Sequence, residues 1–298
     1  MKIGFIGLGI MGKPMSKNLL QAGYELVVLD HKQTAMDELA ALGAETAPTP
    51  GAVAERTEII LTMLPNSPQV KEVILGPDGV VAGAKAGALV IDTSSIAPLV
   101  SREVGARLAE RGVRFLDAPV SGGEPKAVDG TLSFMVGGPE ADFAAARPVL
   151  ACMGSSVVLC GGVGAGNVTK LANQVMVAVN IAAASEALLL ATKAGVEPEK
   201  VFEAIKGGLA GSAALNAKAP LIMDRRFDPG FRINLHIKDL ANVLDTGHEV
   251  GAPLPLTAAV MEMMQTLKAD GHEKKDHGAL ALYYEKLGGA EISRGERE

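Results

Sequence analysis

A glycine pattern near the N-terminus constrains the fold more than any other feature of the sequence. The apolar run 2–6 is followed by Gly7-x-Gly9-x-x-Gly12, and a helical pattern of apolar residues continues over 13–22. In such a pattern the first glycine permits a tight turn, the second lets a pyrophosphate approach the backbone, and the third lets the helix pack on the strand. We therefore predict a dinucleotide-binding loop. Its cofactor-binding residues would be Gly7, Leu8, Gly9, Ile10, Met11 and Gly12.

The residues after this loop supply the context that the pattern requires. A second strand pattern, 25–30, ends in Asp30, close to the spacing of about 20 residues that is typical of the motif. A carboxylate there can accept both ribose hydroxyls of an adenosine, which favours NAD(H), whereas His31 and Lys32 could attract the 2′-phosphate of NADP(H). The cofactor is therefore predicted to be NAD(H) or NADP(H), and the choice stays open. The structural alternative is a βαβ unit that binds no nucleotide.

Strand and helix patterns alternate as far as about residue 160, and beyond it only helical patterns occur. This order predicts an α/β Rossmann-type doubly wound sheet over 1–162, followed by an all-α domain over 163–298 that opens with a long helix. In doubly wound sheets ligands lie beyond the carboxyl ends of the strands. We therefore expect Leu64, Pro65 and Ser95, which follow two predicted strands, to line the cofactor crevice. Each of these loops could instead be a simple connection.

Composition excludes several classes of partner. The formal net charge is −6 and the sequence pI is about 5.5, which argues against a nucleic-acid partner or an anionic membrane surface. The longest apolar stretch, 175–191, contains Asn180 and Glu186 and is marginal in length for a bilayer span, so we expect a buried helix. The N-terminal apolar run is broken by glycines and lacks a cleavage site, which favours a cytoplasmic location. The expected partner is a small molecule, and no metal-ligand spacing occurs.

Several polar groups are candidates for the chemistry. Ser121 offers a hydroxyl, and the backbone N–H groups of Gly122 and Gly123 could cradle a small carboxylate; the alternative is a plain glycine turn. Lys170 and Asn173 lie at i and i+3 of the long helix, so a cation and an amide share one face just after the glycine-rich segment 161–166.

Each lysine also has an ordinary interpretation. Lys170 by itself would most often be a solvated side chain. Lys238 stands beside Asp239 in an otherwise apolar helix, where a surface ion pair is the ordinary alternative.

These motifs, in this order, resemble the β-hydroxyacid dehydrogenase family over essentially the whole chain. The segments that look like its signatures are 7–15 and 117–126. The resemblance implies that Lys170 is the catalytic lysine and Asn173 its partner amide. It also implies that Ser121, Gly122 and Gly123 bind substrate together with Lys170 and Asn173, and that Ser95 and Lys238 lie near the cofactor.

The same resemblance implies NAD(P)H-dependent reduction of a semialdehyde to a hydroxy acid, with Lys170 as general acid. Segments 63–71, 207–212 and 229–240 resemble the members of the family that act on tartronate semialdehyde, which implies its reduction to D-glycerate. The 3-hydroxyisobutyrate dehydrogenases share the same set of motifs. A decarboxylating phosphogluconate enzyme usually has Lys-x-x-His-Asn, but here Asn173-Gln174 follows Lys170 at the positions of that His-Asn. A non-catalytic NAD-binding sensor is the alternative from another class. The apolar long helix favours a homodimer or homotetramer.

Overall fold

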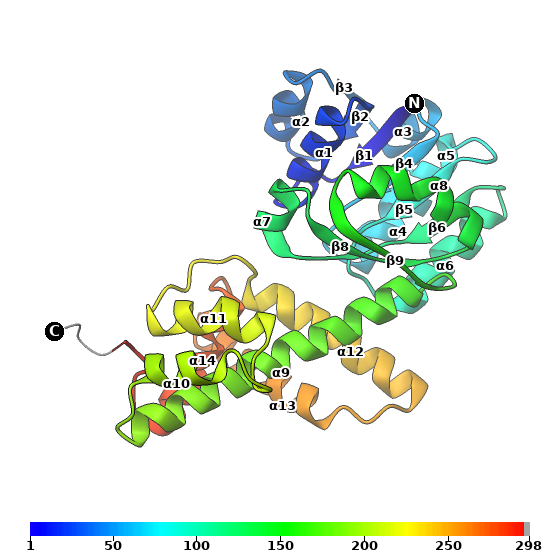
Figure 1. Cartoon of the computed structure of the whole chain (residues 1–298). Helices are drawn as coiled ribbons and strands as arrows, with labels where there is room; N and C mark the ends of the chain where they lie inside the picture. The colour runs from blue at the N-terminus through cyan, green and yellow to red at the C-terminus, as the bar shows by residue number, and fades with distance from the viewer. Residues whose placement is uncertain (295–298) are drawn as a thin grey trace. The chain divides into compact units, whose positions relative to one another are not determined.

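The computed structural model of the protein describes residues 1–294 of the 298-residue chain. Its contacts divide the chain into two compact units, Met1–Lys170 and Leu171–Glu298. The first unit is an α/β fold built on one sheet, and the described part of the second is helical (Figure 1). This order of elements confirms the predicted fold class. The contacts of the first unit extend past the end of its last strand into the long helix that follows.

The sheet of the first unit has the strand order β3-β2-β1-β4-β5-β6-β8-β7, with β9 beside β8. The strands are β1 (Lys2–Ile6), β2 (Glu25–Leu29), β3 (Glu45–Thr46), β4 (Ile59–Thr62), β5 (Leu89–Asp92), β6 (Arg114–Asp117), β7 (Val120–Ser121), β8 (Leu132–Gly137) and β9 (Gly154–Gly161). Strands β1 to β6 are parallel, and β8 runs antiparallel to β6. The order reverses at β1, which lies between β2 and β4, and a crevice for a ligand is expected outside the carboxyl ends of strands at such a point.

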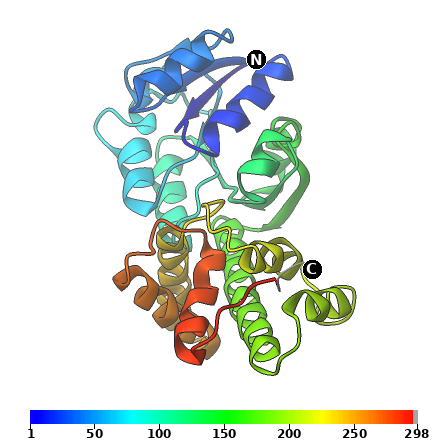
Figure 2. The ribbon, with the colours of Figure 1, turned by 90° about the vertical axis from the view of Figure 1, so that its left-hand side faces the viewer.

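Helices cover both faces of this sheet, as Figure 2 shows. They are α1 (Gly12–Gln21), α2 (Gln33–Ala40), α3 (Pro50–Glu55), α4 (Ser67–Leu75), α5 (Val80–Gly83), α6 (Pro98–Ala109), α7 (Gly123–Val128) and α8 (Glu140–Ala151). One core packs α1, α2, α7 and α8 against alternate strand residues such as Ile3 and Phe5. The other packs α3, α4, α5 and α6 against the intervening residues, such as Ile6 and Ile60. Because both faces are covered, β4 and β5 are buried throughout, which explains why both are apolar up to their last residues, Thr62 and Asp92.

Several short elements had no counterpart in the predicted patterns. Strands β3 and β7 have two residues each, and α3, α5 and α7 have four to six. A segment this short spans too few repeats of 2 or 3.6 residues for its hydrophobic pattern to be recognised. Helix α3 nevertheless carries a local signal, because Thr49 accepts a hydrogen bond from the backbone of Ala52 and Pro50 occupies the first turn.

The second unit is an assembly of helices. They are α9 (Ala165–Lys193), whose first turns belong to the first unit, α10 (Pro198–Ile205), α11 (Ala213–Met223), α12 (Ile233–Val250), α13 (Pro255–Ala269) and α14 (Ala281–Gly288), with the 3₁₀ helix η1 (His277–Leu280) before α14. Helix α9 is long and apolar enough to cross a membrane by length and composition alone. Its buried residues Leu171, Ile181 and Leu188 contribute to the two cores of the helical unit. We therefore interpret α9 as a core helix that is only partly buried, with 39 % of its most apolar part inside the structure, whereas the sequence predicted a buried helix.

Candidate functional site

The glycine loop between β1 and α1 has the tight geometry that the sequence pattern requires. Gly7 has φ +96°, and a Cβ atom on it would overlap the carbonyl oxygen of Met63 at the end of β4. A Cβ on Gly12 would overlap the carbonyl oxygen of Gly7. At Gly9 nothing lies within 4 Å of the position that a Cβ would take. The backbone is thus open at Gly9, where a pyrophosphate must approach, and the residues present fit a dinucleotide.

Asp30 lies against this loop at the end of β2. One carboxylate oxygen, Oδ2, accepts a hydrogen bond of 2.6 Å from the backbone N–H of Leu8. The other, Oδ1, accepts one of 2.8 Å from the N–H of Lys32 and lies 3.1 Å from His31 Nδ1. The side chain is only 6 % exposed, while that of His31 is 83 % exposed. Asp30 therefore holds the glycine loop in place, beside any role it has toward a ribose.

The loops after β4 and β5 lie together at the same edge of the sheet. The backbone N–H of Leu64 donates a hydrogen bond of 2.8 Å to Ser94 Oγ. The side chain of Leu64 also comes within 3.2 Å of a Cβ built on Gly7. Ser95 is half-buried next to Ser94, and Pro65 is exposed. The structure thus brings the predicted residues Leu64, Pro65 and Ser95 to the carboxyl edge of β4 and β5, and β4 lies next to β1, the strand that the glycine loop follows.

A buried carboxylate anchors the helix that carries Lys170. Asp117, the last residue of β6, accepts hydrogen bonds of 2.6 Å from the N–H of Gly164 and 2.7 Å from the N–H of Asn167. Asn167 in turn accepts a hydrogen bond of 3.0 Å from the N–H of Ile96 and donates one of 3.0 Å to Ser101 Oγ. Burial raises the pKa of Asp117 to about 6, although the two N–H donors oppose this shift. The start of α9 is therefore tied to both β6 and the loop after β5.

The glycines before α9 serve close packing. A Cβ on Gly166 would overlap the carbonyl oxygen of Met135, and Gly164 has φ +92°. Neither position accepts an ordinary side chain without strain. The sequence indicated a glycine-rich entry to this helix but missed the anchoring roles of Asp117 and Asn167. The one available signal was an acidic residue at the end of a predicted strand.

The predicted catalytic and substrate-binding residues of the first unit lie on three elements. Lys170 on α9 is only 8 % exposed, which is unusual for lysine, so the interpretation as an ordinary solvated side chain does not hold. Ser121 is half-buried on β7, opposite Ser133 of β8. Gly122 and Gly123 follow with φ +141° and +70°, which side chains rarely adopt, and they open α7.

The other two predicted site residues belong to the helical unit. Asn173 is half-buried on α9, one turn after Lys170. Lys238 lies on α12 with its Nζ 2.8 Å from Oδ1 of Asp239, whose side chain is 3 % exposed. Because the carboxylate is buried, this is not the surface ion pair that was the ordinary alternative. Gln174, which is 4 % exposed, connects Asn173 with Asp239 by hydrogen bonds and was not among the predicted site residues.

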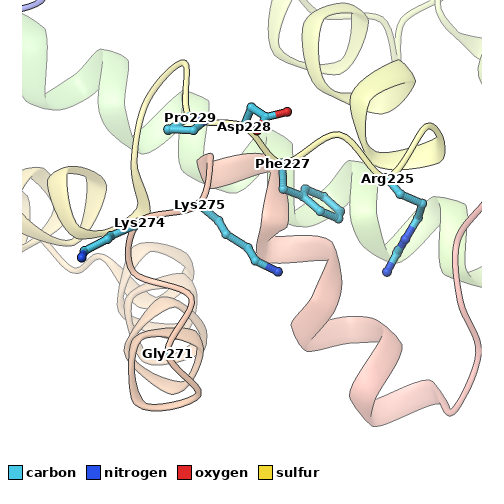
Figure 3. A pocket seen from close by; sticks show the side chains of 7 residues that line it. All are labelled: Arg225, Phe227, Asp228, Pro229, Gly271, Lys274 and Lys275. Carbon is cyan, nitrogen blue, oxygen red and sulfur yellow. The ribbon is translucent and has the colours of Figure 1, made fainter.

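A separate pocket of about 400 Å³ lies in the helical unit. Figure 3 shows Arg225 and Lys275 on either side of the Phe227 ring, with the Arg225 guanidinium 5.3 Å and the Lys275 ammonium 5.8 Å from its centre. None of the predicted site residues lines this pocket. Within residues 1–294, no group of three His, Cys, Asp or Glu side chains could hold a metal ion.

The second buried carboxylate of the sheet edge leads to a prediction on stability. Asp92 of β5 is fully buried; its Oδ1 accepts hydrogen bonds from Thr62 and Ser94, and its Oδ2 has no hydrogen-bond partner in the described part of the chain. Burial raises the pKa of Asp92 from 3.8 to about 6; the hydrogen bonds oppose this shift, and the nearby Asp117 carboxylate adds to it. A carboxyl group with a raised pKa in the folded state stabilises the fold below its unfolded pKa, and this contribution is lost as the pH rises through 6.

We therefore expect Asp92→Asn to remove a pH dependence. Between pH 4 and 7 the free energy of unfolding of the wild type should fall by about 2.4 kcal/mol relative to the variant, because each pKa unit corresponds to about 1.4 kcal/mol and part of the shift from 3.8 to about 6 is already lost at pH 4. The amide is neutral throughout, so the difference between the two proteins measures the titration of Asp92 together with its effect on the nearby Asp117 carboxyl group. Urea denaturation of both proteins at four pH values measures the difference. A difference that does not change with pH would contradict the assignment.

Two protein families match the chain in succession. Residues 2–162 match the NAD binding domain of 6-phosphogluconate dehydrogenase, and residues 164–284 match the NAD-binding domain of NADP-dependent 3-hydroxyisobutyrate dehydrogenase. These matches support NAD(H) or NADP(H) as the cofactor, in agreement with the glycine loop.

Relatives of known activity match nearly the whole chain. The 2-hydroxy-3-oxopropionate reductase of Escherichia coli is 44 % identical over 96 % of this chain and 98 % of its own length. The mitochondrial 3-hydroxyisobutyrate dehydrogenase of Rattus norvegicus is 37 % identical over 94 % of this chain and 86 % of its own length. The solved structure of 3-hydroxyisobutyrate dehydrogenase from Mycobacterium tuberculosis with L-serine superposes with a TM-score of 0.89 at 34 % identity and covers 95 % of this chain and 98 % of that one. The chain belongs to the β-hydroxyacid dehydrogenase family, and it is an NAD(P)-dependent oxidoreductase that acts on CH–OH groups.

Proposed function

We propose that the enzyme reduces tartronate semialdehyde (2-hydroxy-3-oxopropanoate) to D-glycerate with NADH or NADPH. The observation that carries the proposal is the almost complete burial of Lys170, on a helix whose start is held by Asp117. The 44 % identity to the Escherichia coli 2-hydroxy-3-oxopropionate reductase supports the choice of substrate.

Lys170 is the proposed general acid of this reaction. Reduction of an aldehyde leaves negative charge on the carbonyl oxygen, and the bound nicotinamide supplies the hydride. The ammonium group of Lys170 hydrogen-bonds the carbonyl oxygen and gives up a proton as that oxygen becomes an alkoxide, which combines electrostatic and general-acid catalysis. In the reverse direction the neutral amine of Lys170 accepts the hydroxyl proton.

The neighbouring groups orient the substrate. Ser121 and the backbone N–H groups of Gly122 and Gly123 would bind its carboxylate, which turns the aldehyde toward Lys170. Asn173, one turn later on α9, would hold the substrate hydroxyl or the lysine itself. The proposed cofactor residues are Gly7, Leu8, Gly9, Ile10, Met11, Gly12, Asp30, Leu64, Pro65, Ser95 and Lys238.

A 3-hydroxyisobutyrate dehydrogenase is the second candidate, because relatives of that name are 34 % and 37 % identical to this chain. The substrates differ in one group: tartronate semialdehyde carries a hydroxyl where the rival carries a methyl. A site that hydrogen-bonds the hydroxyl leaves a polar group unpaired when the methyl analogue binds. We therefore expect kcat/KM for tartronate semialdehyde to exceed that for the methyl analogue, methylmalonate semialdehyde, by at least about 100-fold.

Steady-state assays of both semialdehydes, each with NADH and with NADPH, test this expectation. A methyl analogue that is reduced as fast or faster would contradict the proposal and favour the second candidate. Absence of turnover with every substrate and both cofactors would favour a non-catalytic nucleotide-binding protein. The homodimer or homotetramer that the sequence favours stays a prediction.

A further inference from the structure

Four polar side chains of the helical unit form a connected series, which we call the polar relay: Asn173, Gln174, Asp239 and Lys238. Asn173 Nδ2 donates a hydrogen bond of 2.8 Å to Gln174 Oε1. Gln174 Nε2 donates one of 2.6 Å to Asp239 Oδ2. Lys238 Nζ lies 2.8 Å from the other oxygen of Asp239. The middle members, Gln174 and Asp239, are only 4 % and 2 % exposed, so water cannot readily replace their partners.

The chemistry of Asp239 gives the relay a direction. Asp239 is paired with the Lys238 ammonium, and a carboxylate only accepts hydrogen bonds. Gln174 must therefore turn its nitrogen toward Asp239 and its oxygen toward Asn173. Because an amide oxygen only accepts, Asn173 must in turn direct its nitrogen at Gln174. The amide oxygen of Asn173 is then turned away from Gln174.

We propose that Gln174 and Asp239 are positioning residues that lock the Asn173 amide with its nitrogen toward Gln174, so that its oxygen is offered to the ammonium group of Lys170. Residues three apart on α9 share a face, so the Lys170 ammonium is the hydrogen-bond donor expected beside the Asn173 oxygen. An acceptor at the ammonium favours the charged form, which is the form that donates a proton to the substrate. The inference rests on the proposed function, in which Lys170 is the general acid.

Gln174→Met tests the relay without changing any charge. Methionine has a similar length and no amide, so the Asn173 nitrogen loses its acceptor and the amide can turn. We expect kcat at pH 8 to fall about 10-fold and the basic limb of the kcat/KM pH profile to move to lower pH by about one unit, because the ammonium loses a hydrogen bond. The KM for NAD(P)H should stay unchanged, since Lys238 and Asp239 keep their ion pair.

Gln174→Glu is the matched control. The introduced carboxylate still accepts a hydrogen bond from Asn173, and its negative charge can only favour the ammonium form of Lys170. The basic limb should therefore not move to lower pH in this variant. If both Gln174 variants move the limb to lower pH, or neither does, the inference is overturned.

Asp239→Asn gives an independent check if the methionine variant does not fold. The Lys238 ammonium attracts the oxygen of the introduced amide, which turns the amide nitrogen toward Gln174 and reverses the relay. The basic limb should then move to lower pH, while that of Gln174→Glu does not. If Asp239→Asn keeps the wild-type limb, the inference is overturned.

The inference and the proposed function fail in different ways. Near-normal turnover after removal of the Lys170 amine would refute the proposed function. Loss of turnover in that variant, together with unmoved pH profiles in the relay variants, would refute only the polar relay.

Discussion

Replacing Lys170 with alanine is expected to lower kcat by at least about 1,000-fold, since a positioned general acid contributes about 10²–10⁴-fold and a charged donor at the developing oxyanion contributes further. The variant should still bind NAD(P)H, because the glycine loop and Asp30 hold their geometry through contacts that do not involve Lys170. The expected result is therefore an enzyme that binds cofactor and does not turn over.

Cofactor titration by NAD(P)H fluorescence and steady-state reduction of tartronate semialdehyde measure the two properties separately. Lys193→Ala is the matched control, because Lys193 ends the same helix, is exposed, and donates a hydrogen bond to the Gly288 carbonyl oxygen. Its kcat should stay within about twofold of the wild type, as for most surface substitutions. A near-normal kcat in Lys170→Ala would refute the role of Lys170 as general acid.

Valine at Gly12 should lower stability and valine at Gly9 should weaken cofactor binding, although both residues belong to one loop. At Gly12 a Cβ overlaps the Gly7 carbonyl oxygen, so the backbone must shift, and we expect the free energy of unfolding to fall by about 3 kcal/mol. At Gly9 the space is open, so stability should change by less than about 0.5 kcal/mol. The Gly9 side chain would instead occupy the approach to the pyrophosphate.

The Kd for NAD(P)H should rise by about 10- to 100-fold in Gly9→Val, because hydrogen bonds to a charged phosphate are worth about 1.5–3 kcal/mol. Urea denaturation without cofactor and fluorescence titration of NAD(P)H separate the two defects. Wild-type affinity in a folded Gly9→Val variant would mean that the pyrophosphate does not lie against this glycine.

The repeating patterns of the chain were readable because each spans several periods. The mostly apolar strands β4 and β5 and the helices α1, α9 and α12 follow directly from residue order, as does the change from an α/β unit to a helical one. The glycine loop was also predictable, since the turn, the approach of the pyrophosphate and the close helix–strand packing each need a residue without a side chain. Two-residue strands and helices shorter than two turns were not predicted, because they are too short to show a repeating hydrophobic pattern.

The candidate residues were identified from the sequence, but their connections were not. The order of motifs indicated Lys170, Asn173, Ser121 and Lys238 individually. Nothing in residue order predicts that Asp117 accepts the backbone N–H groups at the start of α9, or that Gln174 joins Asn173 to Asp239. Apart from the bond between the neighbours Asn173 and Gln174, these contacts join residues distant in the chain, and one sequence by itself does not indicate which distant residues meet.

Residue order alone determined the fold class, the cofactor loop and the list of candidate groups, because helix and strand periods and glycine conformations are local properties of the backbone. Only the tertiary structure decided the burial of Lys170, the pKa of about 6 of Asp92 and Asp117, and the direction of the polar relay. Burial and hydrogen-bond direction depend on which groups surround a side chain in space, and packing of the whole chain determines those groups.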